Sequence, residues 1–449
     1  MIDCAIIGAG LAGLVAAKEL RERGLSVVVL EARDRVGGRV KNAILDDGSY
    51  LELGGQWIVP GSDRLMALIE HYGLDTVPPP FQDGKFIARQ RGVAHEIPSE
   101  ADEPKLNPFE LADLGQGLLR LRRLARRAKN DTAWSEANQE WLSQSLGRWV
   151  KTNLRTESAQ RRFVEVYEPV FGDLTEETTL RQGLELVGDG PDLESLFATN
   201  GRLVQHRVVG GMHALAEALA DELGDDELRL GAPVEKVRHG ETATLVLRDG
   251  EEIESRFVIS TLPPRLAVEL EYDPPLPEWR AEEADKVSPG NVIKAFLLFD
   301  TPFWRDRGLS GQSSADEGAV RVTFDTTVDG ARRGNLMGFF AGGEAASLSK
   351  RTPELREEAF LESVQKSFGD VPKPVAYVER DWTAEEFTQG CHGAHFSPGI
   401  WSAVGPGLAE PEGILHWAGA EYSQKFNGYL EGAVRSGMTT AAQVALRRA

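Results

Sequence analysis

A glycine-rich turn between two apolar runs, within the first 31 residues, leaves few folds open to this chain. Residues 3–31 read DCAIIGAGLAGLVAAKELRERGLSVVVLE. An apolar run at residues 5–7 is followed by the glycine turn, a stretch of helical character that stops at Gly24, and a second apolar run at residues 27–30. The order of strand, glycine turn, helix and strand predicts an α/β, Rossmann-like domain that binds a dinucleotide.

The spacing of the glycines matches the backbone demands of such a site. Gly8 permits the tight turn, Gly10 lets the backbone approach a pyrophosphate, and Gly13 lets the helix pack on the strand. The N-terminus of the helix then offers free N–H groups to the phosphates. Glu31, which closes the second strand, is placed to accept hydrogen bonds from a ribose hydroxyl pair.

Two further glycine pairs follow the fingerprint. The stretch ARDRVGGRV contains Gly37 and Gly38, and LELGGQWI contains Gly54 and Gly55. Repeated glycines let backbone approach a ligand closely, so these pairs indicate a long, extended ligand that passes several loops. Ordinary turn glycines are the alternative interpretation.

Composition narrows the class of protein and of partner. A chain of 449 residues is longer than one core usually supports, so we expect two domains. Hydrophobic residues make up 41% and charged residues 27%, which is typical of a soluble globular protein. The formal net charge of -20 argues against nucleic acid as a partner, because no excess of Lys and Arg exists to neutralise phosphates.

Cysteine usage and hydropathy suggest a cytoplasmic protein. Two cysteines cannot build a disulfide framework, and Cys4 lies in an apolar run where a small buried side chain is the default. No apolar segment reaches the roughly 18 residues that span a bilayer. The first element begins at residue 2, which leaves no room for a signal peptide. We expect no membrane anchor and no metal.

The middle of the chain changes from helix to strand. From residue 114 to about residue 200 the pattern is helical, with interruptions, and Leu118, Leu121, Leu124 and Ala128 fall on one helical stripe. The basic residues between Arg120 and Lys129 then form a solvated face, with an anionic surface partner as the alternative. From residue 203 strands return, with an Asp-Gly turn at residues 249 and 250.

The C-terminal half contains two further elements that bear on function. NVIKAFLLFDTPFW, from Asn291, predicts an apolar strand that contains a single charge, Lys294. A charged side chain in such a strand is costly without a partner, so a functional role is favoured over a buried ion pair. The final block predicts a strand, a loop and a helix that starts around Gly428.

Seven ordered blocks together carry a family resemblance. GAGLAGL, EARDRVGGR, LELGGQW, VVGGM, VIKAFLLFDTPFW, DWTAEEFTQGC and FNGYLEGAVRSG resemble the flavin-containing amine oxidases, the monoamine oxidase family. The match runs from residue 2 to about residue 445 and is weakest between about 80 and 200. The resemblance implies FAD, extended with its adenine end at the N-terminal unit and its isoalloxazine ring near the C-terminal blocks.

The resemblance also implies two interleaved domains. Residues 1–80, 203–272 and 385–449 are expected to form a discontinuous FAD-binding domain, and residues 81–202 and 273–384 a substrate-binding α+β domain.

Within this frame Val234 is implied to lie against the adenine and Trp382 near the flavin. The residues expected to bind the cofactor are Gly8, Ala9, Gly10, Ala12, Gly13, Glu31, Ala32, Arg33, Gly37, Gly38, Arg39, Leu53, Gly54, Gly55, Gln56, Trp57, Val234, Trp382, Cys391, Gly419, Ala420, Glu421, Gly428, Tyr429, Leu430 and Ala433.

Cys391 occupies a notable position in the resemblance. In membrane-bound monoamine oxidases a cysteine in this block forms a thioether to the flavin 8-methyl carbon, and QGCH places Cys391 there. The resemblance therefore implies covalent FAD, attached as 8α-S-cysteinyl flavin. A free thiol that lines the flavin site is the alternative, because many bacterial relatives lack the cysteine.

Three residues are implied to be catalytic. Lys294 matches a family lysine that holds a water near flavin N5, and Tyr429 matches one wall of an aromatic cage in front of the flavin. The other wall is usually Tyr or Trp, and this chain has His392 there. A neutral imidazole still forms a wall, whereas a protonated one repels an ammonium substrate; an imidazole turned away from the substrate is the third interpretation.

The expected reaction is oxidation of a primary amine. The neutral amine loses a hydride equivalent to flavin N5, O₂ accepts the electrons, and the products are aldehyde, ammonia and hydrogen peroxide. Leu184, Val187 and Phe197 either line the substrate cavity or belong to the core. The partners are a small-molecule amine and O₂, and a homodimer is left open.

Two other functions are left open. An L-amino-acid oxidase or another flavin desaturase needs an arginine to clamp a carboxylate, for which Arg181 and Arg321 are candidates. An FAD-binding module without catalysis is the alternative from another class.

Overall fold

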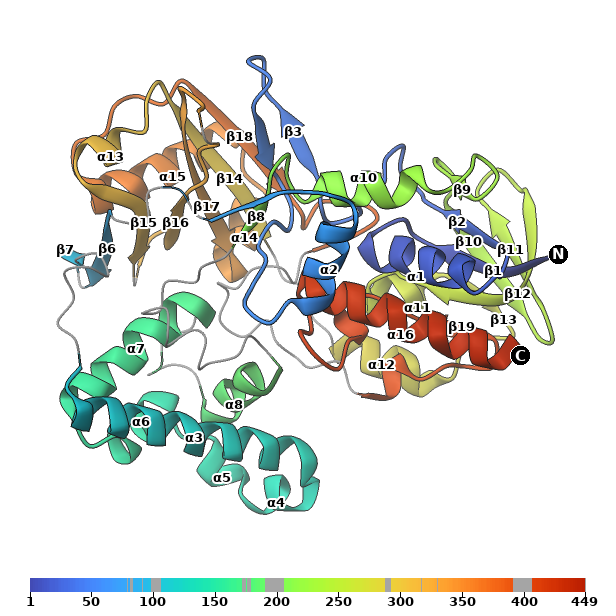
Figure 1. Ribbon diagram of the computed structural model, residues 1–449, viewed down its shortest axis with the longest axis horizontal. Helices are drawn as coiled ribbons and strands as arrows, with labels where there is room; N and C mark the ends of the chain where they lie inside the picture. Colours follow the sequence, from blue (N-terminus) through green and yellow to red (C-terminus); the bar gives the residue numbers. More distant parts are fainter. Residues whose placement is uncertain are drawn as a thin grey trace.

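The computed structural model describes residues 1–78, 80, 84–90, 92–97, 106–171, 175, 179–189, 206–286, 292–315, 317–328, 330–390 and 406–448. These residues form two large β-sheets with helices against them and a separate cluster of helices (Figure 1). The mixed α/β class expected from the sequence is confirmed.

The first sheet contains the N-terminal fingerprint. Its described strands follow the order β13-β10-β11-β12-β1-β2-β9, with β19 paired to β12. At its centre β1 runs parallel to both β12 and β2, and the apolar runs of β1 and β2 are mostly buried. The strands are β1 (Ile2–Ile7), β2 (Val27–Leu30), β9 (Leu228–Arg229), β10 (Val234–His239), β11 (Ala243–Leu247), β12 (Glu252–Ser260), β13 (Glu271–Asp273) and β19 (Leu415–Trp417).

Helices from both ends of the chain cover this sheet. α1 (Leu11–Glu22) packs against α16 (Leu430–Arg448), so the two termini lie close together in Figure 1. Their contact is close because a Cβ on Gly437 would lie 2.5 Å from the carbonyl oxygen of Ala12. α2 (Asp63–His71) and α10 (His213–Asp221) pack beside this pair. The predicted C-terminal helix is confirmed, with its start at Leu430.

The second sheet is built around one fully buried strand. Its described strands follow the order β18-β14-β17-β16-β15-β6-β7, and all eight residues of β14 are buried. β14 pairs antiparallel with both β17 and β18. The bounds are β6 (Lys85–Gln90), β7 (Val93–Ile97), β14 (Val292–Phe299), β15 (Leu309–Ala315), β16 (Val322–Asp325), β17 (Gly334–Ala341) and β18 (Ala376–Asp381), with α13 (Phe303–Asp306), α14 (Gly342–Leu348) and α15 (Pro353–Phe368) against them.

The helical region begins at α3, whose N-terminus is fixed by a capping box between Asn107 and Glu110. Leu118 and Leu121 of the predicted stripe are buried, and Leu124 and Ala128 pack against the same core. The interpretation of α3 as an amphipathic helix with a solvated basic face is confirmed. The helices are α3 (Pro108–Asn130), α4 (Thr132–Ala137), α5 (Gln139–Leu142), α6 (Leu146–Asn153), α7 (Glu157–Phe171) and α8 (Leu180–Asp189).

Leu184 of α8 is buried in this helical core and Val187 packs against it, while Phe197 lies outside the described residues. The connecting elements are β3 (Asn42–Ile44), β4 (Tyr50–Glu52), β5 (Thr76–Val77), β8 (Arg207–Val208), α11 (Pro264–Glu269) and α12 (Glu278–Lys286). Within the described part of the chain, no helix has the length and hydropathy that crossing a membrane requires.

Candidate active site

The glycine turn lies between the end of β1 and the start of α1. Gly8 has φ +101, a conformation that favours glycine, and its N–H donates to the carbonyl oxygen of Leu30 at 2.8 Å. A Cβ on Gly13 would lie 2.0 Å from the carbonyl oxygen of Gly8. The turn can therefore pack against its helix because residue 13 has no side chain.

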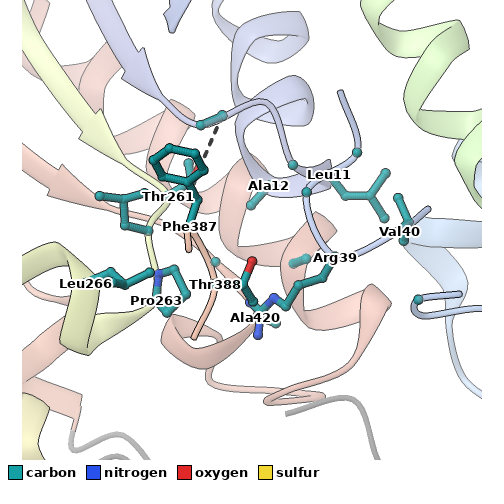
Figure 2. Close-up of a pocket in the computed structure, with 18 of the residues that line it drawn as sticks. Leu11, Ala12, Arg39, Val40, Thr261, Pro263, Leu266, Phe387, Thr388 and Ala420 are labelled. Carbon is teal, nitrogen blue, oxygen red and sulfur yellow. Dashed lines mark hydrogen bonds between the residues drawn. The ribbon is translucent and has the colours of Figure 1, made fainter. Parts of the chain in front are cut away.

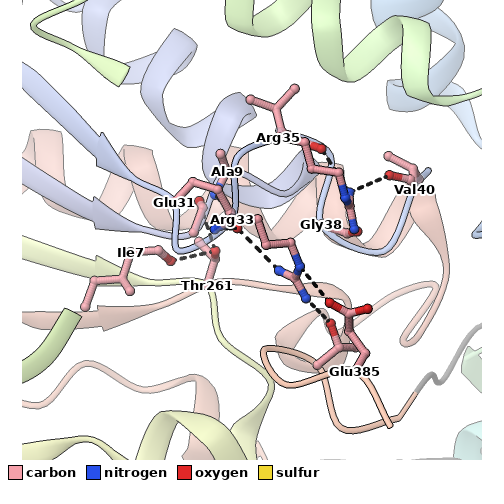
Figure 3. Close-up of polar contacts among 12 residues, drawn as sticks. Ile7, Ala9, Glu31, Arg33, Arg35, Gly38, Val40, Thr261 and Glu385 are labelled. Carbon is pink, nitrogen blue, oxygen red and sulfur yellow. Dashed lines mark hydrogen bonds and ion pairs between the residues drawn. The ribbon is translucent and has the colours of Figure 1, made fainter. Parts of the chain in front are cut away.

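A second loop closes on this turn. A Cβ on Gly38 would lie 3.2 Å from the Cα atom of Gly10, and the N–H of Gly37 donates to the carbonyl oxygen of Ala9 at 2.8 Å. Arg35 holds the loop, because its guanidinium donates to the carbonyl oxygens of Val36 at 3.1 Å and Gly38 at 3.0 Å (Figure 3). Burial, followed by the charge of Arg33, lowers the pKa of Arg35 to about 10.

Glu31, at the end of β2, binds both the turn and the following residues. Its Oε2 accepts from the N–H of Ala9 at 2.8 Å and its Oε1 from the N–H of Arg33 at 3.0 Å (Figure 3). The Arg33 guanidinium donates to Glu385 at 3.0 Å and to Thr388 at 2.8 Å. Carboxylate oxygens accept more than one hydrogen bond, so Glu31 keeps capacity for a ribose.

A cavity of about 470 Å³ extends from this turn into the space between the two sheets (Figure 2). Its lining includes most of the residues selected from the sequence: Gly8, Gly10, Ala12, Glu31, Ala32, Arg33, Gly37, Gly38, Arg39, Gly54, Gly55, Gln56, Trp57, Val234, Lys294, Trp382, Gly419, Ala420, Gly428, Tyr429, Leu430 and Ala433.

Four described residues that were expected to bind the cofactor do not line the cavity but contact residues that do: Ala9, Gly13, Leu53 and Glu421. Ala9 and Gly13 belong to the glycine turn, and the carbonyl oxygen of Leu53 accepts from Trp382 Nε1 at 2.8 Å. The Glu421 carboxylate forms a two-point ion pair with the Arg39 guanidinium, with one N–O distance of 2.8 Å. Glu421 thus acts on the cavity through Arg39, which lines it.

The structure adds residues that sequence reasoning missed. Thr261, Pro263 and Leu266 follow β12 and line the cavity opposite Leu11 and Val40 (Figure 2). Their position directly after a strand could have indicated them. β12 is parallel to β1, and ligands bind outside the carboxyl ends of parallel strands.

A short segment after β18 also joins the cavity. Phe387, Thr388 and Gln389 belong to its lining, and the guanidinium carbon of Arg33 lies 5.3 Å from the Phe387 ring centroid. These residues precede Cys391, and no local motif indicated that they would lie beside Arg33.

Lys294 brings a cation to the other end of the cavity. Its side chain is 2% exposed, and its Nζ donates to the carbonyl oxygen of Gly54 at 2.8 Å and to Gln56 Oε1. The same nitrogen lies 5.6 Å from the Phe296 ring centroid and 5.8 Å from that of Phe339. The buried charge therefore has polar and aromatic partners and still lines the cavity.

The described lining that contains Lys294 also contains several aromatic side chains. Trp57, Phe339, Trp382 and Tyr429 all belong to it, and burial raises the pKa of the Tyr429 hydroxyl, so this group is neutral at ordinary pH. Cys391 and His392 lie outside the described residues.

The described residues fit an extended dinucleotide with a flavin ring. Eight glycines belong to the described lining, and a side chain on Gly8, Gly37 or Gly54 would come within 3.0 Å of a neighbouring atom, so close backbone approach is built in. The Arg39 guanidinium and the N-terminus of α1 supply positive potential for phosphates.

Comparison with known proteins agrees with this site. A family model described as flavin containing amine oxidoreductase matches residues 11–445. A Mycobacterium tuberculosis protein named as a flavin-containing monoamine oxidase, AofH, is 35% identical over 447 residues, which cover 99% of this chain and 96% of the relative. The fold and site are those of a flavoprotein oxidoreductase. This chain belongs to the flavin-containing amine oxidoreductase family, and the resemblance seen in the sequence is confirmed.

Solved structures give the same answer. Wild-type putrescine oxidase bound to putrescine has a TM-score of 0.81 at 29% identity and matches over 99% of both chains. Cyclohexylamine oxidase from Brevibacterium oxydans has a TM-score of 0.80 at 29% identity, with coverage of 100% of this chain and 99% of that chain. This protein is therefore an enzyme of the flavin-containing amine oxidase type.

Proposed function

We propose that this protein is a cytoplasmic, FAD-dependent oxidase of primary amines that uses O₂ and releases aldehyde, ammonia and hydrogen peroxide. The observation that carries the proposal is a buried lysine, Lys294, in one continuous cavity with the dinucleotide turn at Gly10. Oxidation of a C–N bond needs a flavin held beside a dry, oriented substrate site, and this cavity combines both requirements.

When bound, FAD supplies the acceptor for the hydride equivalent and passes two electrons to O₂. The chain's own residues bind and orient. The turn at Gly8 and Gly10, with Glu31, holds the adenosine end, and Arg39 faces the phosphates. Trp57, Phe339 and Tyr429 exclude water from the reacting carbon, and Lys294 holds a water or a proton at its Nζ.

We also propose that residues 1–80, 203–272 and 385–449 form the FAD-binding domain and residues 81–202 and 273–384 the substrate domain. Support comes from the strands: β1, β2, β10, β11, β12 and β19 lie in the first sheet, and β6, β7, β14, β15, β16, β17 and β18 in the second. Cys391 forms the thioether to the flavin in this proposal, and His392 replaces one aromatic wall of the substrate cage.

The described lining favours an apolar monoamine as substrate. In the described lining, Lys294 Nζ contacts the uncharged amide of Gln56 and lies 5.8 Å from the Phe339 ring centroid. The carboxylates of that lining belong to the end of β2, to β10, to α11 and to the segment after β18: Glu31, Glu235, Glu269 and Glu386. A second ammonium group would meet the charge of Lys294 without a carboxylate from the described wall.

An amino-acid oxidase receives less support. The candidate carboxylate clamps Arg181 and Arg321 are both described, and neither belongs to the cavity lining. Lys294 remains as a cation at the reactive end, so a carboxylate substrate belongs in any substrate test.

A peroxide-coupled screen tests the proposal. The substrates are benzylamine, phenethylamine, alkylamines, putrescine and L-amino acids, with catalase added in a parallel well to show that the signal is hydrogen peroxide. We expect peroxide with benzylamine, phenethylamine or an alkylamine, and less with putrescine. Peroxide from amino acids alone would replace this proposal by the amino-acid oxidase, and an FAD-loaded protein inactive on the whole panel would favour the non-catalytic module.

A further inference from the structure

A buried ion pair lies behind the lysine, outside the cavity lining. Glu52 ends β4 and Arg207 begins β8, and the two residues are 4% and 5% exposed. The distance between Glu52 Oε2 and Arg207 Nη1 is 3.9 Å. Glu52 Oε1 accepts from the N–H of Met212 at 2.8 Å, which fixes the carboxylate. Burying a charge costs desolvation free energy, so the position of this pair next to the partners of Lys294 suggests a role for it.

The strip from Glu52 to Trp57 connects the pair to the cavity wall. Its first residue holds the ion pair, and two positions later the carbonyl oxygen of Gly54 accepts from Lys294. Gln56 accepts from the same Nζ, and lysine has no acceptor of its own, so the amide oxygen of Gln56 must face Lys294. Trp57, at the end of the strip, lies under Arg207, whose guanidinium carbon is 6.0 Å from the ring centroid.

Arg207 also connects the strip to the second sheet. Its Nη1 donates to the carbonyl oxygen of Thr326, just after β16, at 3.1 Å. The first residue of the strip, Glu52, is thus held by its ion pair with Arg207. Arg207 also covers the last residue of the strip, Trp57. A displacement of Glu52 or Arg207 would move the two acceptors that orient Lys294.

Two nearby positive charges act on the Glu52 carboxyl. Burial raises the pKa of the Glu52 carboxyl, and the positive charges of Arg207 and then Lys294 oppose that rise. Tyr50, on the same strand, is the further titratable group that senses both Glu52 and Arg207. When Glu52 is ionised, its carboxylate offsets positive charge from both Arg207 and Lys294.

We propose that Glu52 is a positioning residue for Lys294: paired with Arg207, its carboxylate compensates the buried positive charge and holds the strip that carries the lysine's two acceptors. The kinetic part of this inference rests on the proposed amine oxidation. The electrostatic part does not, because it concerns charges that are buried whether or not an amine is oxidised.

A double-mutant cycle on thermal stability tests the electrostatic part. The proteins are the FAD-loaded wild type, Glu52→Gln, Lys294→Met and the double variant. Glu52→Gln removes the carboxylate on which the charges of Arg207 and Lys294 act, and is expected to lower the melting temperature by about 5 °C. In the Lys294→Met background, Glu52→Gln should lower the melting temperature by about half as much, because the cation of Lys294 has already been removed. Equal costs in both backgrounds would show that Glu52 does not compensate Lys294 and would overturn the proposal.

Anaerobic stopped-flow measurement of flavin reduction by the best amine tests the positioning part. Glu52→Gln should slow reduction about tenfold in the wild-type background and by less than about twofold in the Lys294→Met background. Glu52→Asp keeps the charge and should recover most of the rate. Equal slowing in both backgrounds, or no recovery with Asp, would contradict a role through Lys294.

Asp325→Asn provides a matched control. Asp325 is a carboxylate of similar burial, 5% exposed, paired with Arg305 and with Trp304 Nε1 outside the cavity lining. Its variant should lose stability and keep the wild-type reduction rate. If the panel contains no substrate, the stability cycle still decides between a coupled and an independent Glu52, so failure of the proposed reaction and failure of this inference remain distinguishable.

Discussion

The two ends of the cavity are built in opposite ways. At the dinucleotide end, the ligand-facing atoms belong to glycine loops at the ends of parallel strands, as at Gly8 and Gly38. At the reactive end, Lys294 projects from the middle of a fully buried antiparallel strand, and its partners come from residues about 240 positions earlier. The first end depends on backbone shape, and the second on side chains brought together by the fold.

This difference determines how each end responds to change. A glycine loop is disturbed by any added side chain, so substitutions there should act on cofactor affinity. Lys294 and its acceptors touch the reaction through charge and orientation, so substitutions there should act on rate. Three predictions separate the two behaviours, and a fourth concerns the stability of the first sheet.

The largest expected effect is at Cys391, which follows the segment that Arg33 ties to the dinucleotide end. Cys391→Ala should release FAD into the supernatant on acid precipitation, whereas the unmutated protein keeps its yellow colour in the pellet, because a thioether survives denaturation. Absorbance of pellet and supernatant measures the distribution. Colour lost equally from both proteins would refute the covalent link.

The next effect is on rate. Lys294→Met should slow flavin reduction or reoxidation by about 10²- to 10³-fold without loss of FAD, because it removes the Nζ that holds a proton or water at the site. Lys366→Met, on the exposed face of α15, is the control and should be unchanged. Turnover near the wild-type value in Lys294→Met would mean that this lysine is not part of the chemistry.

A smaller effect is expected on cofactor affinity. Gly13→Ala puts a Cβ 2.0 Å from the carbonyl oxygen of Gly8, so α1 must shift, and FAD affinity should fall by about 10- to 100-fold. Equilibrium titration of the deflavinated protein measures it, with Cys391→Ala as the parent. Gly115→Ala, in α3 with no atom within 4 Å of the added Cβ, should be neutral or slightly stabilising. Unchanged affinity in Gly13→Ala would disprove the predicted packing role of this glycine.

The smallest effect concerns acid stability of the first sheet. His416 on β19 is fully buried, and burial with the charge of Arg447 lowers its pKa from 6.5 to about 4. A depressed pKa means that the neutral form is preferred in the folded state, so stability present above pH 6.5 is lost as the pH falls towards 4. We expect His416→Gln to lose about 2 kcal/mol less of its unfolding free energy over that interval than the wild type. Parallel denaturant titrations at both pH values measure it, and identical losses would exclude His416 as a contributor.

The sequence predicted the dinucleotide end better than the reactive end for a physical reason. The turn at Gly8, Gly10 and Gly13 is local, and its spacing alone requires a particular backbone. The buried strand of Lys294 was also predictable, because a single charge among seven apolar residues is unusual in any element. In β14 the charge stands among seven apolar residues, whereas the position of Phe339 directly opposite Lys294 depends on the register between β14 and β17, which no short stretch encodes.

The same reasoning explains why the ion pair of Glu52 and Arg207 was not predicted from the sequence. Glu52 stands in LELGGQW, where the residues from Leu53 to Trp57 were assigned to cofactor binding and Glu52 was not. Its partner Arg207 is about 155 residues away. An isolated acid in an apolar stretch gives a signal that something pairs with it, but the partner's identity requires the fold. Arg33 and Glu385 form another such pair across the chain.

The most direct test is the visible spectrum of the purified protein, recorded anaerobically before and after addition of benzylamine. We expect flavin absorbance that bleaches when the amine is added and returns when air is admitted. A colourless protein that takes up no added FAD would contradict the cavity's assignment and, with it, the proposed reaction.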